Sequence, residues 1–167
     1  TSAQIDKASG DWGGIALCGK ATNNLPGGFG TLEGGDGTPF YGGSDDADNS
    51  GTLKYVRIEY AGYAPLTDKE LNALTMASVG SGTVISHVQC SYGKDDAFEW
   101  FGGTVNCDHL IAFKTQDDMF DSDNGFRGIV QYALGYSSPN IADISGSNGF
   151  ESDNDAAGST NSPKTRA

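Results

Sequence analysis

Short apolar runs and alternating segments divide this chain into candidate β-strands of similar length. Residues 15–18 form an apolar run between glycine-rich turns, which is typical of a buried strand. Residues 52–60 alternate polar and apolar positions, as a half-buried strand does. Segments 84–92, 105–113 and 129–136 have comparable lengths, and turns that contain Gly or Asn separate several of them. We therefore expect an all-β chain.

A repeat with a period of 22 residues links two of these segments. Residues 92–103 (YGKDDAFEWFGG) align with residues 114–125 (KTQDDMFDSDNG), and the Phe-acid pair recurs at Phe150 and Glu151. A constant period of this length, built of short strands and turns, is typical of a solenoid in which each repeat forms one coil. Sandwiches and barrels do not require a constant coil length. We therefore predict a right-handed parallel β-helix, whose coils lie roughly 4.8 Å apart.

The same period predicts which side chains stack inside the solenoid. Residues separated by one coil occupy equivalent positions on neighbouring strands, so an inward residue lies over another inward residue. The expected inward columns are Val88, Leu110 and Tyr132; Cys90, Ala112 and Leu134; and Phe98, Phe120 and Phe150.

We expect one domain over the 167 residues, which is long enough to bury a sizeable core. Residues 10–51 are interpreted as an N-terminal strand followed by a long Gly- and Asp-rich loop. A loop of this length in a compact domain is usually functional or partner-bound. The regular coils are expected over residues 52–136, an interrupted last coil over 137–155 and a polar tail over 156–167.

Several segments of the chain resemble secreted bacterial β-helix repeat proteins, most of which have no assigned function. The segments are GDWGGIALCGKA, SGTLKYVRIEYAG, ELNALTMASVGSGT, DDAFEWFGGTVN and SGSNGFESDNDA, and the resemblance covers most of residues 10–165. It implies a right-handed parallel β-helix, an extracellular or bacterial outer-surface location, and further coils after the Pro-Lys-Thr segment. It supplies no reaction and no catalytic residues.

The charge of the chain excludes two classes of partner. Asp and Glu number 22 against 10 Lys and Arg, giving a formal net charge of −12. Affinity for nucleic acid depends on Lys and Arg that meet phosphates, and an anionic membrane surface attracts the same residues. We therefore expect no nucleic-acid partner and no membrane insertion. Cations and neutral sugars are partners that such a surface does not repel.

The repeat also stacks carboxylates, because it places Glu99 over Asp121. Two carboxylates on adjacent coils repel by roughly 3–4 kcal/mol at an effective dielectric constant near 20. Water, a raised pKa, backbone amides or a bound cation relieve this cost. Oxygen ligands select a hard ion, so Ca²⁺ is the natural candidate. The compatible alternative is that the acidic residues cap turn amides. The candidate metal ligands are Asp95, Asp96, Glu99, Asp117, Asp118, Asp121 and Asp123.

Aromatic residues and paired carboxylates also suggest a carbohydrate ligand. Trp100 and Phe101 are candidates for a sugar-stacking platform, although packing in the core or at a coil edge is favoured. A glycosidase needs two carboxylates across one bond, but repetition of a coil explains these carboxylates without catalysis. His87 and His109, one period apart, are expected to stack as neutral imidazoles, with a two-His metal site as the alternative.

The cysteines give no sign of metal chemistry. Cys18, Cys90 and Cys107 lack metal-binding spacing, so we expect buried thiols or one disulfide with one thiol left over.

The open ends of a solenoid suggest a structural function, because they present unpaired strand edges. The sequence contains no evident amphipathic helix that would cover either end. We therefore expect a non-enzymatic extracellular protein that self-associates through these ends, or by strand or loop exchange, into a homo-oligomer or filament. The alternative is a carbohydrate-binding or polysaccharide-cleaving β-helix module.

Overall fold

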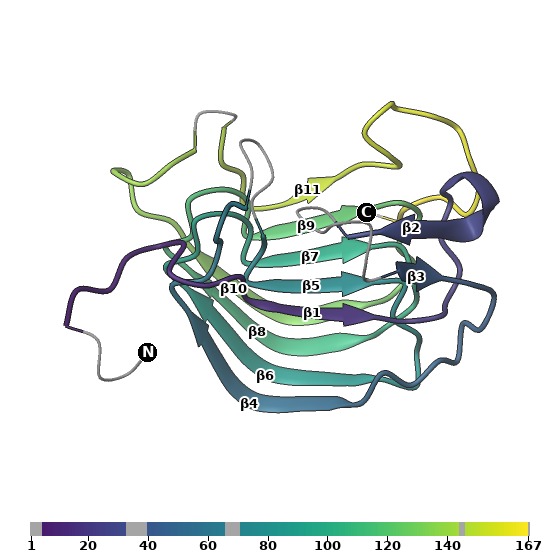
Figure 1. The fold of residues 1–167 in the computed structure, drawn as a ribbon, viewed down its shortest axis with the longest axis horizontal. Coiled ribbons are helices and arrows are strands. Elements are labelled where there is room, and N and C mark those ends of the chain that lie inside the picture. Colours follow the sequence, from purple (N-terminus) through teal and green to yellow (C-terminus); the bar gives the residue numbers. More distant parts are fainter. Residues whose placement is uncertain (1–4, 33–39, 66–70, 144–145, 167) are drawn as a thin grey trace.

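The protein folds into two parallel β-sheets with a shared core between them (Figure 1). The computed structural model describes residues 5–32, 40–65, 71–143 and 146–166. The chain alternates between the two sheets, which confirms the predicted all-β fold and parallel β-helix. The first sheet contains, in spatial order, β1 (Ile15–Cys18), β5 (Leu74–Ala77), β7 (Phe98–Phe101), β9 (Phe120–Asp123) and β11 (Glu151–Ser152). The second sheet contains, in spatial order, β10 (Val130–Tyr136), β8 (Cys107–Phe113), β6 (Val84–Ser91) and β4 (Thr52–Glu59).

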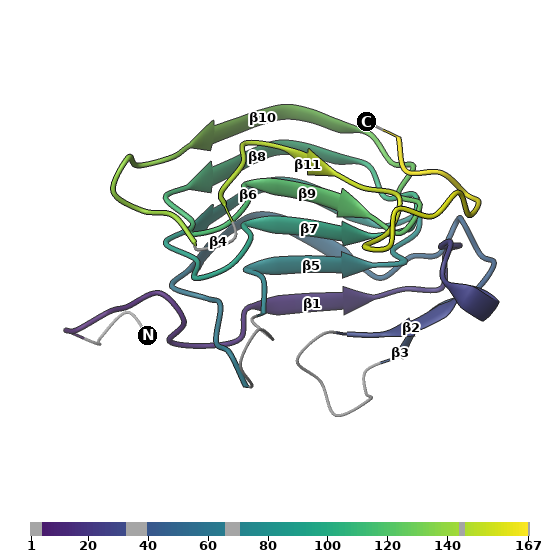
Figure 2. The same cartoon turned by 90° about the horizontal axis from the view of Figure 1, so that it is seen from above.

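The two sheets end together, with β10 and β11 at one end of the solenoid and β4 and β1 at the other (Figure 2). The register gives the length of each coil. Ile85 pairs with Cys107 and Phe98 pairs with Phe120, so both of these coils advance the chain by 22 residues. Other coils differ: the offset is 24 from Leu74 to Phe98 and 23 from Cys107 to Val130.

The single extra residue between β8 and β10 overturns part of the predicted core. Leu110 pairs with Ala133, not with Tyr132, and Ala112 pairs with Gly135, not with Leu134. A shift of one residue moves a strand side chain to the opposite face. Tyr132 and Leu134 are consequently 71% and 61% exposed, and their assignment to inward columns was wrong.

The predicted phenylalanine column is confirmed in the first sheet. The rings of Phe98 and Phe120 stack with centroids 5.5 Å apart, and those of Phe120 and Phe150 with centroids 5.0 Å apart. Phe98 and Phe120 are buried, whereas Phe150 at the end of the solenoid is exposed. Full burial of a phenylalanine side chain contributes about 1.5–3 kcal/mol. The column therefore stabilises the middle of the solenoid more than its end.

Each strand of the second sheet contains one residue in the left-handed conformation. In β6 this residue is His87, with φ of 56°, and the inward residues on either side of it are Ile85 and Val88. These inward residues are three positions apart, because the left-handed residue adds one step to the usual alternation. The same spacing separates buried Cys107 from buried Leu110 in β8. A simple period of two therefore fails at this position of every coil.

The region after β1 contains an antiparallel hairpin where the sequence predicted only a loop. A 3₁₀ turn at Pro26–Gly28 leads into β2 (Phe29–Thr31), which pairs with β3 (Phe40–Gly42). Residues 33–39 of the predicted loop lie outside the described residues. Within the residues that the structure describes, no helix is long and apolar enough to span a membrane.

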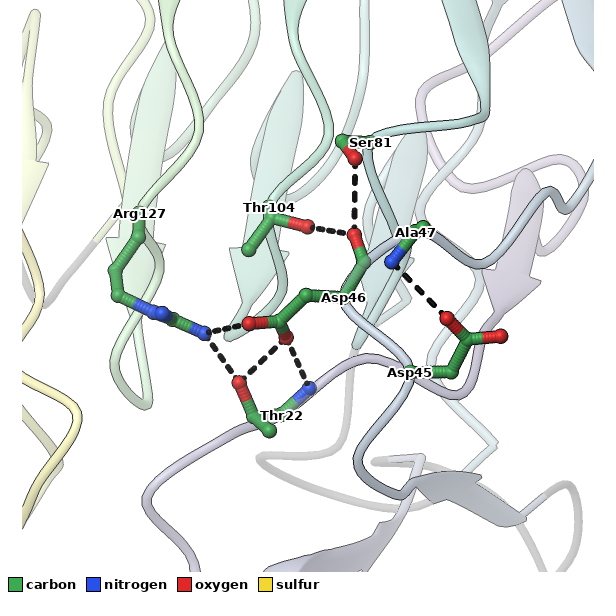
Figure 3. A network of polar contacts seen from close by, with 7 residues as sticks. All are labelled: Thr22, Asp45, Asp46, Ala47, Ser81, Thr104 and Arg127. Atoms are coloured by element: carbon green, nitrogen blue, oxygen red, sulfur yellow. Dashed lines mark hydrogen bonds and ion pairs between the residues drawn. The ribbon is translucent and has the colours of Figure 1, made fainter.

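Asp46, which follows this hairpin, connects the N-terminal region to the corners of successive coils (Figure 3). Its carboxylate accepts hydrogen bonds from the backbone nitrogen of Thr22 at 3.0 Å, from the Thr22 hydroxyl at 2.7 Å and from Arg127 at 3.0 Å. Its carbonyl oxygen accepts hydrogen bonds from Ser81 at 3.0 Å and Thr104 at 2.6 Å. Three consecutive coils supply these partners. Ser81 lies in the turn from β5 to β6, Thr104 in the turn from β7 to β8 and Arg127 in the turn from β9 to β10. One residue of the N-terminal region thus contacts three coils at once.

The three cysteines are free thiols. Cys90 and Cys107 are buried, and Cys18 is half-buried. Burial raises the pKa of all three thiols, to about 12 for Cys107. The expectation of buried thiols therefore holds for Cys90 and Cys107 but not for Cys18, and all three thiols are free in the structure.

Candidate functional site

The outward face of β7, β9 and β11 carries a column of carboxylates. Phe98 and Trp100 of β7 enter the core, so strand alternation turns Glu99 outward between them. Glu99 pairs with Asp121 of β9, and Asp121 pairs with Glu151 of β11. Neighbouring strands lie about 4.7–4.9 Å apart, so three acidic side chains follow one another at that spacing.

These residues line a cleft of about 640 Å³, which we call the acidic cleft. No Lys or Arg occurs among the described residues that line it. Its polar and aromatic lining residues include Asn24 and Phe101. The carboxylates that define it are Asp96, Glu99, Asp117, Asp118, Asp121, Asp123, Glu151, Asp153 and Asp155.

Four of these carboxylates accept hydrogen bonds from backbone amides, as the alternative interpretation of the sequence predicted. Asp123 and Asp155 do so within their own turns, whereas Asp96 and Asp118 do so across coils. Asp96 Oδ1 accepts a hydrogen bond of 2.9 Å from the backbone nitrogen of Asp118. Asp118 Oδ1 in turn accepts a hydrogen bond from the backbone nitrogen of Asn148. Asp96 and Asp118 therefore each cap an amide of the next coil and not of their own turn. This ladder uses Oδ1 of both side chains.

The carboxylates of the acidic cleft, including those that cap amides, repel one another in a partly desolvated environment. Burial, together with the nearby charge of Asp95, raises the pKa of Asp96 to about 9. Burial, together with the charge of Asp118, raises the pKa of Asp121 to about 6. A hydrogen bond with Asp118, followed by burial, raises the pKa of Glu151 to about 7. Between the ordinary pKa values and these raised values, the folded site therefore keeps protons that the same carboxyl groups would lose if they were exposed to water.

Two groups of three carboxylates have the proximity that a metal ion requires. Asp96, Glu99 and Asp121 each offer one oxygen, and these oxygens lie within 4.8 Å of one another. Asp95 and Asp117 form a second such group with Asp96. In the first group Asp121 Oδ1 is buried and has no hydrogen-bond partner. A set of oxygen ligands suits a hard cation such as Ca²⁺, whose charge would also offset the repulsion.

The predicted ligand residues divide between the core and the cleft. Trp100 is only 1% exposed and stacks on Phe126 with ring centroids 5.3 Å apart, so its proposed role in sugar stacking was wrong. Phe101 is half-buried, lines the acidic cleft and stacks on Tyr41 at 6.3 Å. Alternation along β7 gives the reason, because it sends Trp100 inward and Phe101 outward.

The sequence also missed three carboxylates of the cleft. Asp153 and Asp155 were not predicted, and Glu151 was noticed only as part of a broken third repeat. The offset between Asp121 and Glu151 is 30 residues, so a search at a period of 22 does not align them. The Phe-acid pair at 150 and 151 was the signal that could have identified them.

Comparison with known proteins identifies one family. The sequence model described as "Pectate-lyase like beta helix domain" matches residues 1–167. No curated protein and no solved structure matches the chain.

Proposed function

We propose that this chain, which belongs to the family of pectate-lyase like beta helix domains, is a non-enzymatic β-helix module whose acidic cleft binds Ca²⁺. The observation that carries this proposal is the group formed by Asp96, Glu99 and Asp121, whose oxygens lie within 4.8 Å of one another. Asp121 Oδ1 is buried there without a hydrogen-bond donor. A buried carboxylate oxygen without a donor is costly, and a cation removes that cost.

The composition of the cleft favours binding over catalysis. A lyase that acts on an acidic polysaccharide needs a cationic side chain to stabilise negative charge beside the substrate carboxylate. Among the described residues of the acidic cleft there is no Lys and no Arg. The family description names a polysaccharide lyase, but the carboxylates here recur as features of successive coils. A bound Ca²⁺ is then a structural ion that links the coils of β7 and β9.

The proposed setting is extracellular or on a bacterial outer surface. Extracellular Ca²⁺ modules bind with dissociation constants of roughly 10⁻⁴ to 10⁻³ M. An open cleft, in which several carboxylates are protonated before the ion enters, suits affinity in that range. Binding should therefore be measurable at millimolar Ca²⁺ and should release protons.

Calorimetric titration of chelator-treated protein with CaCl₂ tests the proposal. We expect saturable binding and a rise in melting temperature, with a smaller rise for MgCl₂ because Mg²⁺ loses its water reluctantly. The double variant Glu99→Gln/Asp121→Asn should lose both responses. Glu59→Gln, which neutralises a carboxylate outside the cleft beside Arg57, is the matched control and should keep them. Absence of heat and of a thermal shift at millimolar Ca²⁺ in the unmodified protein would rule the site out.

A second function, end-to-end self-association, is favoured by the apolar end of the solenoid. Ile129, Tyr132, Leu134 and Phe150 are all more than half exposed at the end formed by β10 and β11. Ile129 and Phe150 also line a cleft of about 490 Å³ together with core residues that include Phe120. We propose a second copy of the chain as the occupant, with its β4 end placed against this surface.

Sedimentation velocity over a range of concentrations tests this second function. The unmodified protein should form dimers or filaments as its concentration rises, and Phe150→Lys should weaken them. Phe40→Lys places the same charge on an exposed aromatic residue of the hairpin and serves as the control. A strict monomer at all concentrations would contradict self-association.

A further inference from the structure

Four aromatic rings stack in a column on the outside of the second sheet. They belong to Tyr55 in β4, His87 in β6, His109 in β8 and Tyr132 in β10, and we call them the outer ring column. Their centroids are 4.6, 4.3 and 4.8 Å apart in that order. All four residues are left-handed, with φ between 54° and 57°. The column therefore follows the position at which every strand of this sheet bends.

Stacking leaves only the ring edges of the two histidines accessible to a ligand. Tyr55 covers one face of His87, Tyr132 covers one face of His109, and the imidazoles cover each other. Carbohydrate binds aromatic faces, so the middle of the column offers it no platform. The imidazole edges carry nitrogen lone pairs, which makes a metal ion the appropriate ligand to consider.

Asp108 completes a group of metal-binding atoms at these edges. Neighbouring side chains of a strand normally point to opposite faces, but the left-handed backbone at His109 interrupts this alternation. Asp108 Oδ1 consequently lies 2.6 Å from His109 Nδ1 and 4.0 Å from His87 Nδ1. One atom from each of the three residues lies within 4.8 Å of the others.

Ser86, which precedes His87 in β6 and pairs with Asp108 of β8, orients this group. Its hydroxyl donates a hydrogen bond of 2.6 Å to Asp108 Oδ1 and lies 2.8 Å from His87 Nδ1. Groups that hold a metal-binding carboxylate in place are a regular part of metal sites. The His87, Asp108 and His109 side chains are 39%, 45% and 49% exposed, so an ion and its water reach them from solvent.

We propose that His87, Asp108 and His109 form a binding site for Zn²⁺, separate from the acidic cleft on the first sheet. Two imidazoles and one carboxylate are a ligand set that Zn²⁺ uses, with water in the fourth position. Ca²⁺ prefers oxygen ligands, so the two sites select different ions. The ion would join β6 to β8 on the outside of the solenoid.

Binding at this site changes the ring stack. The nitrogen lone pairs lie in the imidazole planes, and these planes are within 12° of parallel. Both nitrogens therefore approach one ion, at about 2.0–2.1 Å, only when the imidazoles tilt toward each other. Zn²⁺ also displaces the proton between His109 Nδ1 and Asp108 Oδ1, which is released to solvent. The tilt separates the imidazole faces from Tyr55 and Tyr132, which gives a signal specific to this site.

Calorimetric titration with ZnCl₂ of protein that carries no histidine tag tests the proposal. Millimolar Ca²⁺ in the buffer competes with Zn²⁺ for the carboxylates of the acidic cleft, and the Asp121→Asn variant below detects any Zn²⁺ that still binds there. We expect one Zn²⁺ per chain. The double variant His87→Phe/His109→Phe should weaken binding at least about tenfold. Tyr55 and Tyr132 carry larger rings at the same φ, so this column accommodates Phe without unfolding.

Two further variants separate this site from the acidic cleft. Asp108→Asn retains a side chain that can bond to Ser86 but removes the charge, and it should also weaken Zn²⁺ binding. Asp121→Asn should leave Zn²⁺ affinity unchanged. Imidazole and tyrosine NMR signals should shift together as Zn²⁺ is added to the unmodified protein. The proposal fails if the His87→Phe/His109→Phe variant binds Zn²⁺ as tightly as the unmodified protein, or if neither binds it.

Discussion

Glu99 on β7 lies over Asp121 on β9 as its direct partner in a parallel register. Two unit charges 4 Å apart repel by about 4 kcal/mol at an effective dielectric constant of 20. Here one oxygen of the pair, Asp121 Oδ1, is buried without a hydrogen-bond partner, and burial raises the pKa of Asp121 to about 6. The pair therefore couples the stability of the solenoid to protons and, under the proposed function, to Ca²⁺.

Stability in the absence of divalent ions should fall as the pH rises. In the unfolded chain Asp and Glu have pKa values of about 3.9 and 4.3, whereas folding raises them to about 6 for Asp121, 7 for Glu151 and 9 for Asp96. The folded state therefore holds more protons, and the stability from these protons is complete below about pH 4 and lost as the pH rises through the folded values. Melting temperatures measured in EDTA from about pH 5 to pH 9 check this. Ca²⁺ should restore stability most at high pH, and a melting temperature that rises with pH in EDTA would contradict the raised pKa values.

Asp121→Asn should stabilise the chelated protein. The amide keeps the shape of the side chain and removes one of two stacked charges. We expect the free energy of unfolding in EDTA to increase by on the order of 1–3 kcal/mol, below the full Coulomb value because water screens part of the cleft. Urea unfolding with and without Ca²⁺ measures both effects. Glu59→Gln is the control for the change in net charge, and an equal gain in that variant would exclude a local cause.

Asp46→Ala should release the N-terminal region from the coil corners. Although burial acts to raise it, hydrogen bonds from Thr22 and Arg127 lower the pKa of Asp46. The variant should lose about 1–3 kcal/mol of stability, because it leaves donors without partners. Hydrogen exchange over residues 40–51 should rise. Asp45→Ala is the matched control, since the Asp45 side chain accepts a local hydrogen bond from the backbone nitrogen of Ala47 (Figure 3).

The stability contributed by the Asp46 carboxylate should depend on pH with the opposite sign to that contributed by the acidic cleft. Folding lowers the pKa of Asp46, so its contribution is present above about pH 3.9 and is lost as the pH falls through the lower folded value. The difference in stability between the unmodified protein and Asp46→Ala should therefore shrink in acid. A constant difference across this range would show that the carboxylate charge does not contribute.

Phe98→Ala and Phe150→Ala should have very different effects on the free energy of unfolding, although both residues belong to one column. Phe98 is completely buried, so its removal should cost about 3–5 kcal/mol through lost burial and a cavity. Phe150 is 71% exposed in the single chain, so its replacement should change the stability of the monomer, measured at low protein concentration, by less than about 1 kcal/mol. Chemical denaturation of the two variants checks this gradient. Equal costs would indicate that another chain covers the end of the solenoid in solution.

The sequence predicted the elements of the acidic cleft that depend on the repeat. In a parallel solenoid, residues separated by one coil lie side by side, so a fixed period converts directly into spatial neighbours. This gave Glu99 over Asp121 and the stacks of Phe98 on Phe120 and of His87 on His109. It could not give Asp153 and Asp155, because the last coil is longer and no constant period reaches them.

The sequence by itself thus determined the parallel β-helix and the stacking of like residues, since both follow from the spacing of the repeat. Only the tertiary structure decided to which side of its sheet each of those side chains points. One extra residue in a coil exposed Tyr132, and a left-handed residue placed Asp108 beside two imidazoles. These orientations depend on the insertion of one residue and on the backbone conformation of one residue. The fold depends also on contacts between distant segments, such as the one between Asp46 and Arg127. A period in the sequence does not contain that information.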